Sequence, residues 1–143
     1  MHLFRNTLSS IMIVLFLLAF AQSAKSQTQA EMNQEAFDSF AEADSVLNVI
    51  YQQIFIEYAN DRTFLENLKK SQRLWIKFRD AEMEARFPMD ERSHYYGSMF
   101  PMCYAAIKKS LTEDRIRQLR VWIDGLPETE GCTGSVTKIK EEE

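Results

Sequence analysis

The stretch SQRLWIKFRDAEMEARF, residues 71–87, has the spacing of an amphipathic helix, but its apolar face carries two polar residues. At 100° per residue, Gln72 and Arg79 fall on the same side as Trp75. An unpaired arginine in an apolar seam is very costly, whereas a paired arginine is tolerated and fixes the register of neighbouring helices. The stretch therefore predicts a helix whose buried face needs polar partners elsewhere in the chain.

Two helices joined by a tight connection are expected around this stretch. The first runs from about Glu31 to Tyr58 and the second ends near Arg86. In NDRT between them, Thr63 and Glu66 have the spacing of a capping box. The expected seam of the first helix is Phe37, Phe40, Asp44, Leu47, Tyr51, Ile54 and Tyr58, and that of the second is Leu65, Leu68, Gln72, Trp75, Ile76, Arg79, Met83 and Arg86.

An antiparallel hairpin of these helices gives both polar intrusions a polar partner. Its tip is expected at Asn60 and Asp61. We interpret the intrusions as a buried hydrogen-bonded layer, while a ligand site at the same place stays open. The expected pairs are Asp44 with Arg79, Tyr51 with Gln72, and Leu47 with Trp75.

The first 26 residues have the composition of a secretory signal. Arg5 supplies a positive n-region, IMIVLFLLAF a short apolar core, and small residues precede Gln27. The apolar run is too short for a membrane span in the mature protein, although an uncleaved N-terminal anchor is the alternative. Removing 26 of 143 residues leaves 117, enough for one domain. We expect a helical domain over 27–126 and a C-terminal tail over 127–143.

The charge balance bears on the class of partner. The signal segment holds two of the 17 basic residues and none of the 21 acidic ones, so the mature chain has a net charge of 15 minus 21, or −6. Binding to nucleic acid needs a basic surface, which argues against that partner. A cationic partner is favoured, although an acidic surface also serves solubility alone.

The two cysteines predict a staple in the C-terminal part. Cys103 and Cys132 both lie in the exported part, where a disulfide is the default. A short helix is expected to open near Pro101, and Thr112 is a good N-cap for another. A bend near Ser110 would bring the two thiols within easy reach, so we predict the bend and the disulfide together. The alternative is two free thiols and a continuous helix.

Catalytic and metal-binding patterns are weak. The mature chain has one histidine, His94, with no nucleophile motif around it. Asp90 and Glu91 beside it suggest a metal cluster without a further ligand, and a solvated loop is the better interpretation. The carboxylates between 80 and 84 point to different sides of a helix, so they do not form a two-carboxylate site. We expect no enzyme activity, no metal and no cofactor.

The segment FPMDERSHYYGSMFPM, residues 87–102, is the longest stretch without clear periodicity. Tyrosine and arginine often anchor interfaces, because they give a large contact area with a polar tip. We predict that Arg92, His94, Tyr95 and Tyr96 contact a partner. The alternative is that these aromatic residues close one end of the core.

Three blocks of the sequence together resemble the LprI-type lysozyme inhibitor family: ADSVLNVIYQQI, QRLWIKFRDAE and YAAIKKSLTEDRIRQLR. Where the family often has a cysteine shortly after its Arg-Asp pair, this chain has Met83, so the family's disulfide pattern is not carried over. The matching positions are Asp44, Leu47, Asn48, Tyr51, Gln72, Trp75, Arg79, Asp80, Thr112, Arg115 and Leu119.

The resemblance implies a small exported bacterial protein that binds and inhibits lysozyme without a cofactor. Its location would be periplasmic or secreted, with no membrane span after signal removal. The acidic mature chain agrees with a cationic lysozyme as target. A non-inhibitory envelope interaction module is the alternative function. The expected fold is all-α, an antiparallel helical hairpin with one or two further helices packed on it.

Overall fold

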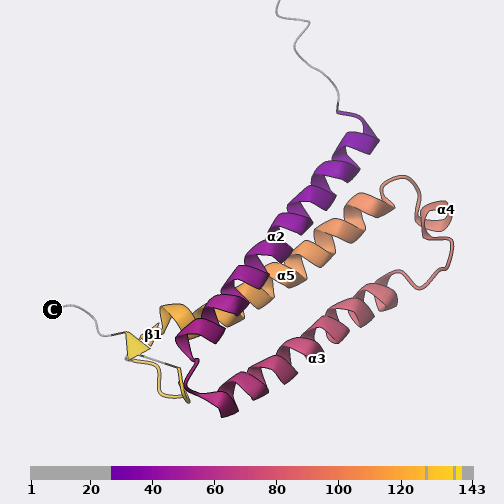
Figure 1. Ribbon diagram of the computed structural model, residues 1–143. Coiled ribbons are helices and arrows are strands. Elements are labelled where there is room, and N and C mark those ends of the chain that lie inside the picture. The colour runs from indigo at the N-terminus through magenta and orange to yellow at the C-terminus, as the bar shows by residue number, and fades with distance from the viewer. Residues whose placement is uncertain (1–26, 128, 137, 140–143) are drawn as a thin grey trace, which may run out of the picture.

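Three long helices and one short helix account for most of the structure, a computed structural model that describes residues 27–127, 129–136 and 138–139 (Figure 1). Within these ranges the fold is all-α, as predicted, apart from one two-residue parallel pairing after the last helix. The expected signal, residues 1–26, lies outside the described part. The elements are α2 (Gln29–Glu57), α3 (Arg62–Arg86), α4 (Arg92–Tyr96), α5 (Phe100–Asp124), β1 (Leu126–Pro127) and β2 (Lys138–Ile139).

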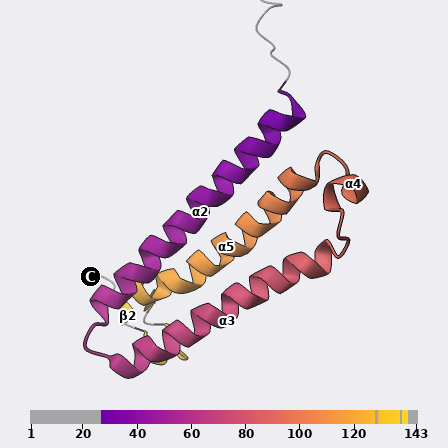
Figure 2. The same ribbon diagram turned by 45° about the vertical axis from the view of Figure 1, so that its right-hand side comes forward.

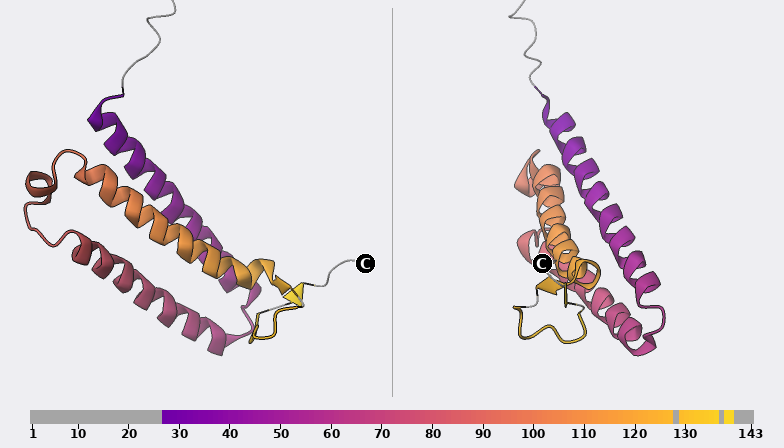
Figure 3. Two further views of the ribbon diagram at one scale, coloured as in Figure 1. Left: turned by 180° about the vertical axis from the view of Figure 1, so that it is seen from behind. Right: turned by 90° about the vertical axis from the view of Figure 1, so that its left-hand side faces the viewer.

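The long helices pack unequally. α2 and α5 run in the same direction and α3 runs opposite to both (Figure 2). The backbones of α2 and α5 approach most closely, and seen from behind α3 lies apart from this pair (Figure 3). Ala43 on α2 and Ala105 on α5 are buried and small, which allows close approach, whereas α3 turns the bulky Trp75, Arg79 and Met83 inward. The predicted hairpin is therefore present in chain order, but its second arm lies farther from α2 than α5 does.

The core lies where the three long helices meet, toward the α2–α3 connection. Phe37, predicted to be in the seam, is 58% exposed, whereas Ile50, outside the predicted seam, is buried. The buried stripe of α2 is displaced because its nearest neighbour is α5. On α3, Ile76 and Arg86 are exposed, contrary to prediction. The buried cluster comprises Leu47, Ile50, Ile54, Leu68 and Leu119, covered by the partly buried Tyr51, Phe55, Tyr58, Phe64, Trp75, Ile116, Trp122 and Ile123.

Both hairpin helices start at side-chain caps. The N-cap of α2 is Thr28, which forms a capping box with Glu31. The pKa of Glu31 is lowered because its carboxylate accepts hydrogen bonds from Thr28, chiefly from the backbone N–H. The N-cap of α3 is Asp61, whose carboxylate accepts from the Phe64 backbone N–H at 2.9 Å. The predicted capping box at Thr63 is wrong, because Asp61 starts the helix two residues earlier.

The predicted bend and disulfide are both wrong. α5 is continuous through Ser110, and Thr112 lies inside it, with its hydroxyl donating to the Lys108 carbonyl at 2.9 Å. Cys103 and Cys132 are free thiols. Cys103 lies in the first turns of α5, which extends about 32 Å from there to its C-terminus. An unbent α5 thus holds Cys103 far from Cys132.

Candidate functional site

A polar layer connects the three long helices at the level of Arg79 on α3. The guanidinium Nη1 donates to Asp44 Oδ1 on α2 at 2.9 Å and to the Thr112 hydroxyl on α5 at 3.3 Å. The Asp44–Arg79 pair is the one that the helical spacing predicts, and it is confirmed. The third residue of the layer, Thr112, was not predicted, because it was expected to cap a helix and not to face the interior of the bundle.

The cation of this layer is more deeply buried than its anion. The Arg79 side chain is 10% exposed and that of Asp44 is 39% exposed. The guanidinium lies 5.0 Å from the centre of the Trp75 ring and 5.8 Å from that of Phe40. Its Nε, which is buried without a hydrogen-bond partner, lies 3.6 Å from Asp80 Oδ1. Arg79 is thus held by aromatic faces as well as by carboxylates.

The second intrusion, Gln72, also finds its partner on α5. Its side-chain carbonyl accepts from Arg115 Nε at 2.9 Å, and Arg115 Nη2 donates to the Ser71 hydroxyl at 3.1 Å. Partial burial lowers the pKa of Arg115. The predicted Tyr51–Gln72 pair is wrong, because Gln72 faces α5. Partial burial raises the pKa of Tyr51, an effect that the charge of Arg73 opposes.

The bundle end that holds α4 is closed by an aromatic cluster. The rings of Phe87, Tyr96, Phe100 and Tyr104 lie in contact, with centroids 5.2 Å apart for Phe87–Phe100 and 5.3 Å apart for Phe87–Tyr96. Tyr95 lies beside Tyr96 at 4.9 Å but is 64% exposed. Tyr96 therefore packs within the cluster, whereas Tyr95 contacts the Tyr96 ring from outside and stays mostly exposed.

Two further residues of α4 were also predicted to contact a partner. Arg92 forms an ion pair with Glu84 at the end of α3 and lies over the Tyr104 ring. His94 is exposed, and so are Met89 and Met99 nearby. The structure thus brings all four predicted residues into one short helix. Arg92 and Tyr96 anchor that helix, whereas His94 and Tyr95 face outward.

The family model described as Lysozyme inhibitor LprI matches residues 21–119. The chain belongs to the LprI lysozyme inhibitor family. The match contains the whole polar layer and the α4 end of the bundle. Comparison with curated proteins and with solved structures gave no match.

Most positions that carry the LprI resemblance lie in or beside the polar layer and the core. Leu47 and Leu119 are in the buried cluster, and Asp80 pairs with Lys108 at 3.4 Å. Asn48 is exposed, and its amide donates to Asp44 at 3.4 Å. The spacing of Thr112, Arg115 and Leu119 places all three on one side of a helix. That spacing could have predicted that these three residues of α5 face the other helices.

An acidic stripe on α2 flanks the α4 end in this LprI-family chain. Asn33 Nδ2 donates to the Ser98 carbonyl at 3.1 Å, which joins the start of α2 to the loop between α4 and α5. Nearby carboxylates recur at helical spacing on one side of α2, and within the described structure none of them forms an ion pair with a basic side chain. α2 contains no lysine, arginine or histidine. The acidic stripe consists of Glu31, Glu35, Asp38 and Glu42.

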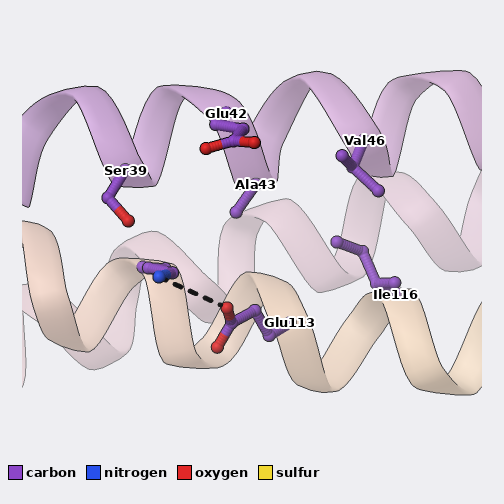
Figure 4. A pocket seen from close by; sticks show the side chains of 7 residues that line it. Ser39, Glu42, Ala43, Val46, Glu113 and Ile116 are labelled. Atoms are coloured by element: carbon purple, nitrogen blue, oxygen red, sulfur yellow. Dashed lines mark ion pairs between the residues drawn. The ribbon is translucent and has the colours of Figure 1, made fainter.

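A shallow groove runs between α2 and α5 beside this stripe (Figure 4). Lys109 Nζ on α5 lies 3.6 Å from Glu113 Oε1, and Glu42 borders the groove from α2. Within the described residues, no group of three histidine, cysteine or acidic side chains is placed to hold a metal ion. The groove extends the acidic surface. Its lining comprises Ser39, Glu42, Ala43, Val46, Lys109, Glu113 and Ile116.

Proposed function

We propose that this chain is an exported bacterial protein that binds and inhibits lysozyme-type muramidases through the α4 end of its bundle. Membership of the LprI family over residues 21–119 carries the proposal. Among the described residues, no helix is long and apolar enough to cross a membrane. The protein would act in the periplasm or outside the cell.

The α4 end suits a rigid contact with a protein. Tyr96 is fixed by Phe87 and Phe100, and Arg92 is fixed by its ion pair with Glu84. A contact surface that is already ordered loses little conformational entropy on binding. The exposed ring of Tyr95 then offers a large amphipathic contact area from a rigid base.

The charge around this end suits a cationic lysozyme. The acidic stripe lies close to the α4 end, because the Asn33–Ser98 hydrogen bond joins the start of α2 to the loop after α4. None of its four carboxylates forms an ion pair within the described residues. Complementary charge speeds encounter and suppresses wrong partners, and its effect is screened by salt. Inhibition should therefore weaken as ionic strength rises.

The proposed mode of inhibition is entry of α4 into the substrate cleft. His94 would lie near the acidic catalytic groups of lysozyme, and Tyr95 would fill a sugar subsite. Arg92 and Tyr96 would hold these two side chains in place from behind. Arg92 would reach the catalytic carboxylates itself only by leaving Glu84.

The second candidate is an envelope interaction module that binds a protein without inhibiting an enzyme. The same exposed residues support it, because a surface tyrosine beside exposed Met89 and Met99 anchors many kinds of protein interface. The two functions differ in whether the lysozyme cleft is blocked.

A lysis assay of the protein beginning at Gln27, against several lysozyme classes at low salt, tests the leading function. We expect at least one class to be slowed at micromolar protein, and Tyr95→Ala to weaken the effect. Phe78→Ala is the matched control, because Phe78 is an exposed aromatic residue on α3 away from α4. If no lysozyme is slowed, inhibition is rejected. If one binds without being slowed, the second candidate is supported.

A further inference from the structure

The outer side of α3 presents an apolar pair among cations. Leu74 and Phe78 are one turn apart and are 58% and 57% exposed. Lys70, Arg73 and Lys77 are exposed beside them on the same half of the helix. The buried residues of α3, which include Gln72 and Arg79, lie on the opposite side. This outer surface, termed the α3 outer face, is therefore separate from the polar layer.

The positive charge of the acidic chain is concentrated on this helix. Residues 62–79 contain six basic residues and one acidic residue, a net charge of 6 minus 1, or +5, although the whole chain has −4. Of the three cations on the α3 outer face, none lies within ion-pair distance of a carboxylate in the described part of the chain. Their charge is thus available to a partner. They are Lys70, Arg73 and Lys77.

The chemistry of the α3 outer face matches an anionic lipid surface. α3 is set apart from the α2–α5 pair (Figure 3), and a shallow hollow on its outer side is lined in part by Lys70, Arg73, Leu74 and Lys77. Cations beside exposed apolar side chains on one side of a helix are typical of helices that lie in a headgroup layer. Long lysine side chains reach headgroup phosphates while Leu74 and Phe78 enter the acyl boundary.

We propose that the α3 outer face binds anionic phospholipid surfaces, with α3 lying flat on the headgroup layer. The acidic stripe of α2 lies on the side of that helix away from Asp44, the residue that points to α3. Repulsion of this stripe from the anionic surface would turn α2 outward. The proposal does not depend on lysozyme binding.

Vesicle co-sedimentation of the protein beginning at Gln27 tests the proposal. The described contacts all lie between residues 27 and 139, and the apolar run within residues 1–26 would bind lipid itself. Vesicles of phosphatidylcholine with phosphatidylglycerol should bind the protein at low salt, and pure phosphatidylcholine vesicles should not. Lys70→Glu with Lys77→Glu should weaken binding by roughly fivefold or more for each cation removed.

The matched control is Arg117→Glu with Arg120→Glu, which changes the net charge equally on exposed positions of α5. This control should keep most of the binding, and circular dichroism should show unchanged helix content in both double variants. Equal losses in the two double variants, or no loss at positions 70 and 77, would overturn the proposal.

A second measurement tests insertion of the apolar pair. The emission that Phe78→Trp adds to that of the native Trp75 and Trp122 should shift to the blue with the anionic vesicles. The emission that Ile56→Trp adds, at an exposed position on α2, should not shift. A shift at 56 without one at 78 would contradict the proposed orientation. Binding to soluble polyglutamate as tight as binding to vesicles would mean an acidic protein partner and would also overturn the lipid proposal.

Discussion

The Asp44–Arg79 pair should respond unequally to the loss of its two partners. Replacing Asp44 with asparagine leaves a cation that is 10% exposed, with the Thr112 hydroxyl and the more distant Asp80 as its polar neighbours. Replacing Arg79 with methionine leaves a carboxylate that is 39% exposed and that water can reach. The penalty for an unpaired charge is larger for the more buried partner.

The expected free energies follow from this exposure. Removing one partner of a fully buried pair costs about 3–5 kcal/mol. Asp44 is more than one-third exposed, and Asp80 lies 3.6 Å from Arg79 Nε, so Asp44→Asn should cost about 2 kcal/mol. Arg79→Met keeps an unbranched apolar stem and removes the charged guanidinium that lies over Trp75, so it should cost about 1 kcal/mol. The double variant should also cost about 1 kcal/mol, because the stranded charge is gone.

Urea unfolding followed by circular dichroism measures these differences, provided that the slope with urea concentration stays constant across the variants. Asp38→Asn is the matched control, since Asp38 is an exposed carboxylate on the same helix and should change stability by less than about 0.5 kcal/mol. A larger loss for Arg79→Met than for Asp44→Asn would refute the reasoning. Additive losses in the double variant would show that the two side chains are not coupled.

Three further predictions concern other parts of the fold. Tyr96→Ala should cost about 2 kcal/mol in urea unfolding because it opens the aromatic cluster, whereas Tyr95→Ala should cost less than about 0.5 kcal/mol; equal losses would contradict the unequal packing of the two rings. The hydrogen bonds that lower the pKa of Glu31 below 4.5 add stability that is present above this pH and lost as pH falls through the folded-state pKa. Glu31→Gln should thus flatten the acid limb of melting temperature against pH, and an unchanged limb would rule out this contribution. Thiol labelling of the unfolded, unreduced protein should find two free thiols, at Cys103 and Cys132. A protein without free thiols would instead contain the Cys103–Cys132 disulfide.

Helical periodicity predicted the helices and the Asp44–Arg79 pair because both depend on which residues share a face. Periodicity does not identify the neighbour that a face meets. The closest partner of α2 is α5, which runs parallel to it, so Ile50 is buried and Phe37 is exposed. Gln72 pairs with α5 for the same reason. The sequence pattern did not show that α5, and not α3, packs most closely against α2.

The sequence located the candidate contact residues, but it did not show which of them anchor α4 and which are exposed. Arg92, His94, Tyr95 and Tyr96 are adjacent along the chain, and no pattern within five residues states which ring turns inward. Packing of Tyr96 against Phe87 and the ion pair of Arg92 decide the sorting. Both contacts join α4 to the end of α3, so they depend on the tertiary fold.

Hydrogen–deuterium exchange of the protein, with and without an excess of lysozyme at low salt, tests most directly whether the α4 end binds lysozyme. Lysozyme should slow exchange of backbone amides in residues 87–99 and leave the outer turns of α3, residues 66–78, unchanged. Unchanged exchange over 87–99, or protection confined to 66–78, would contradict a binding site at the α4 end.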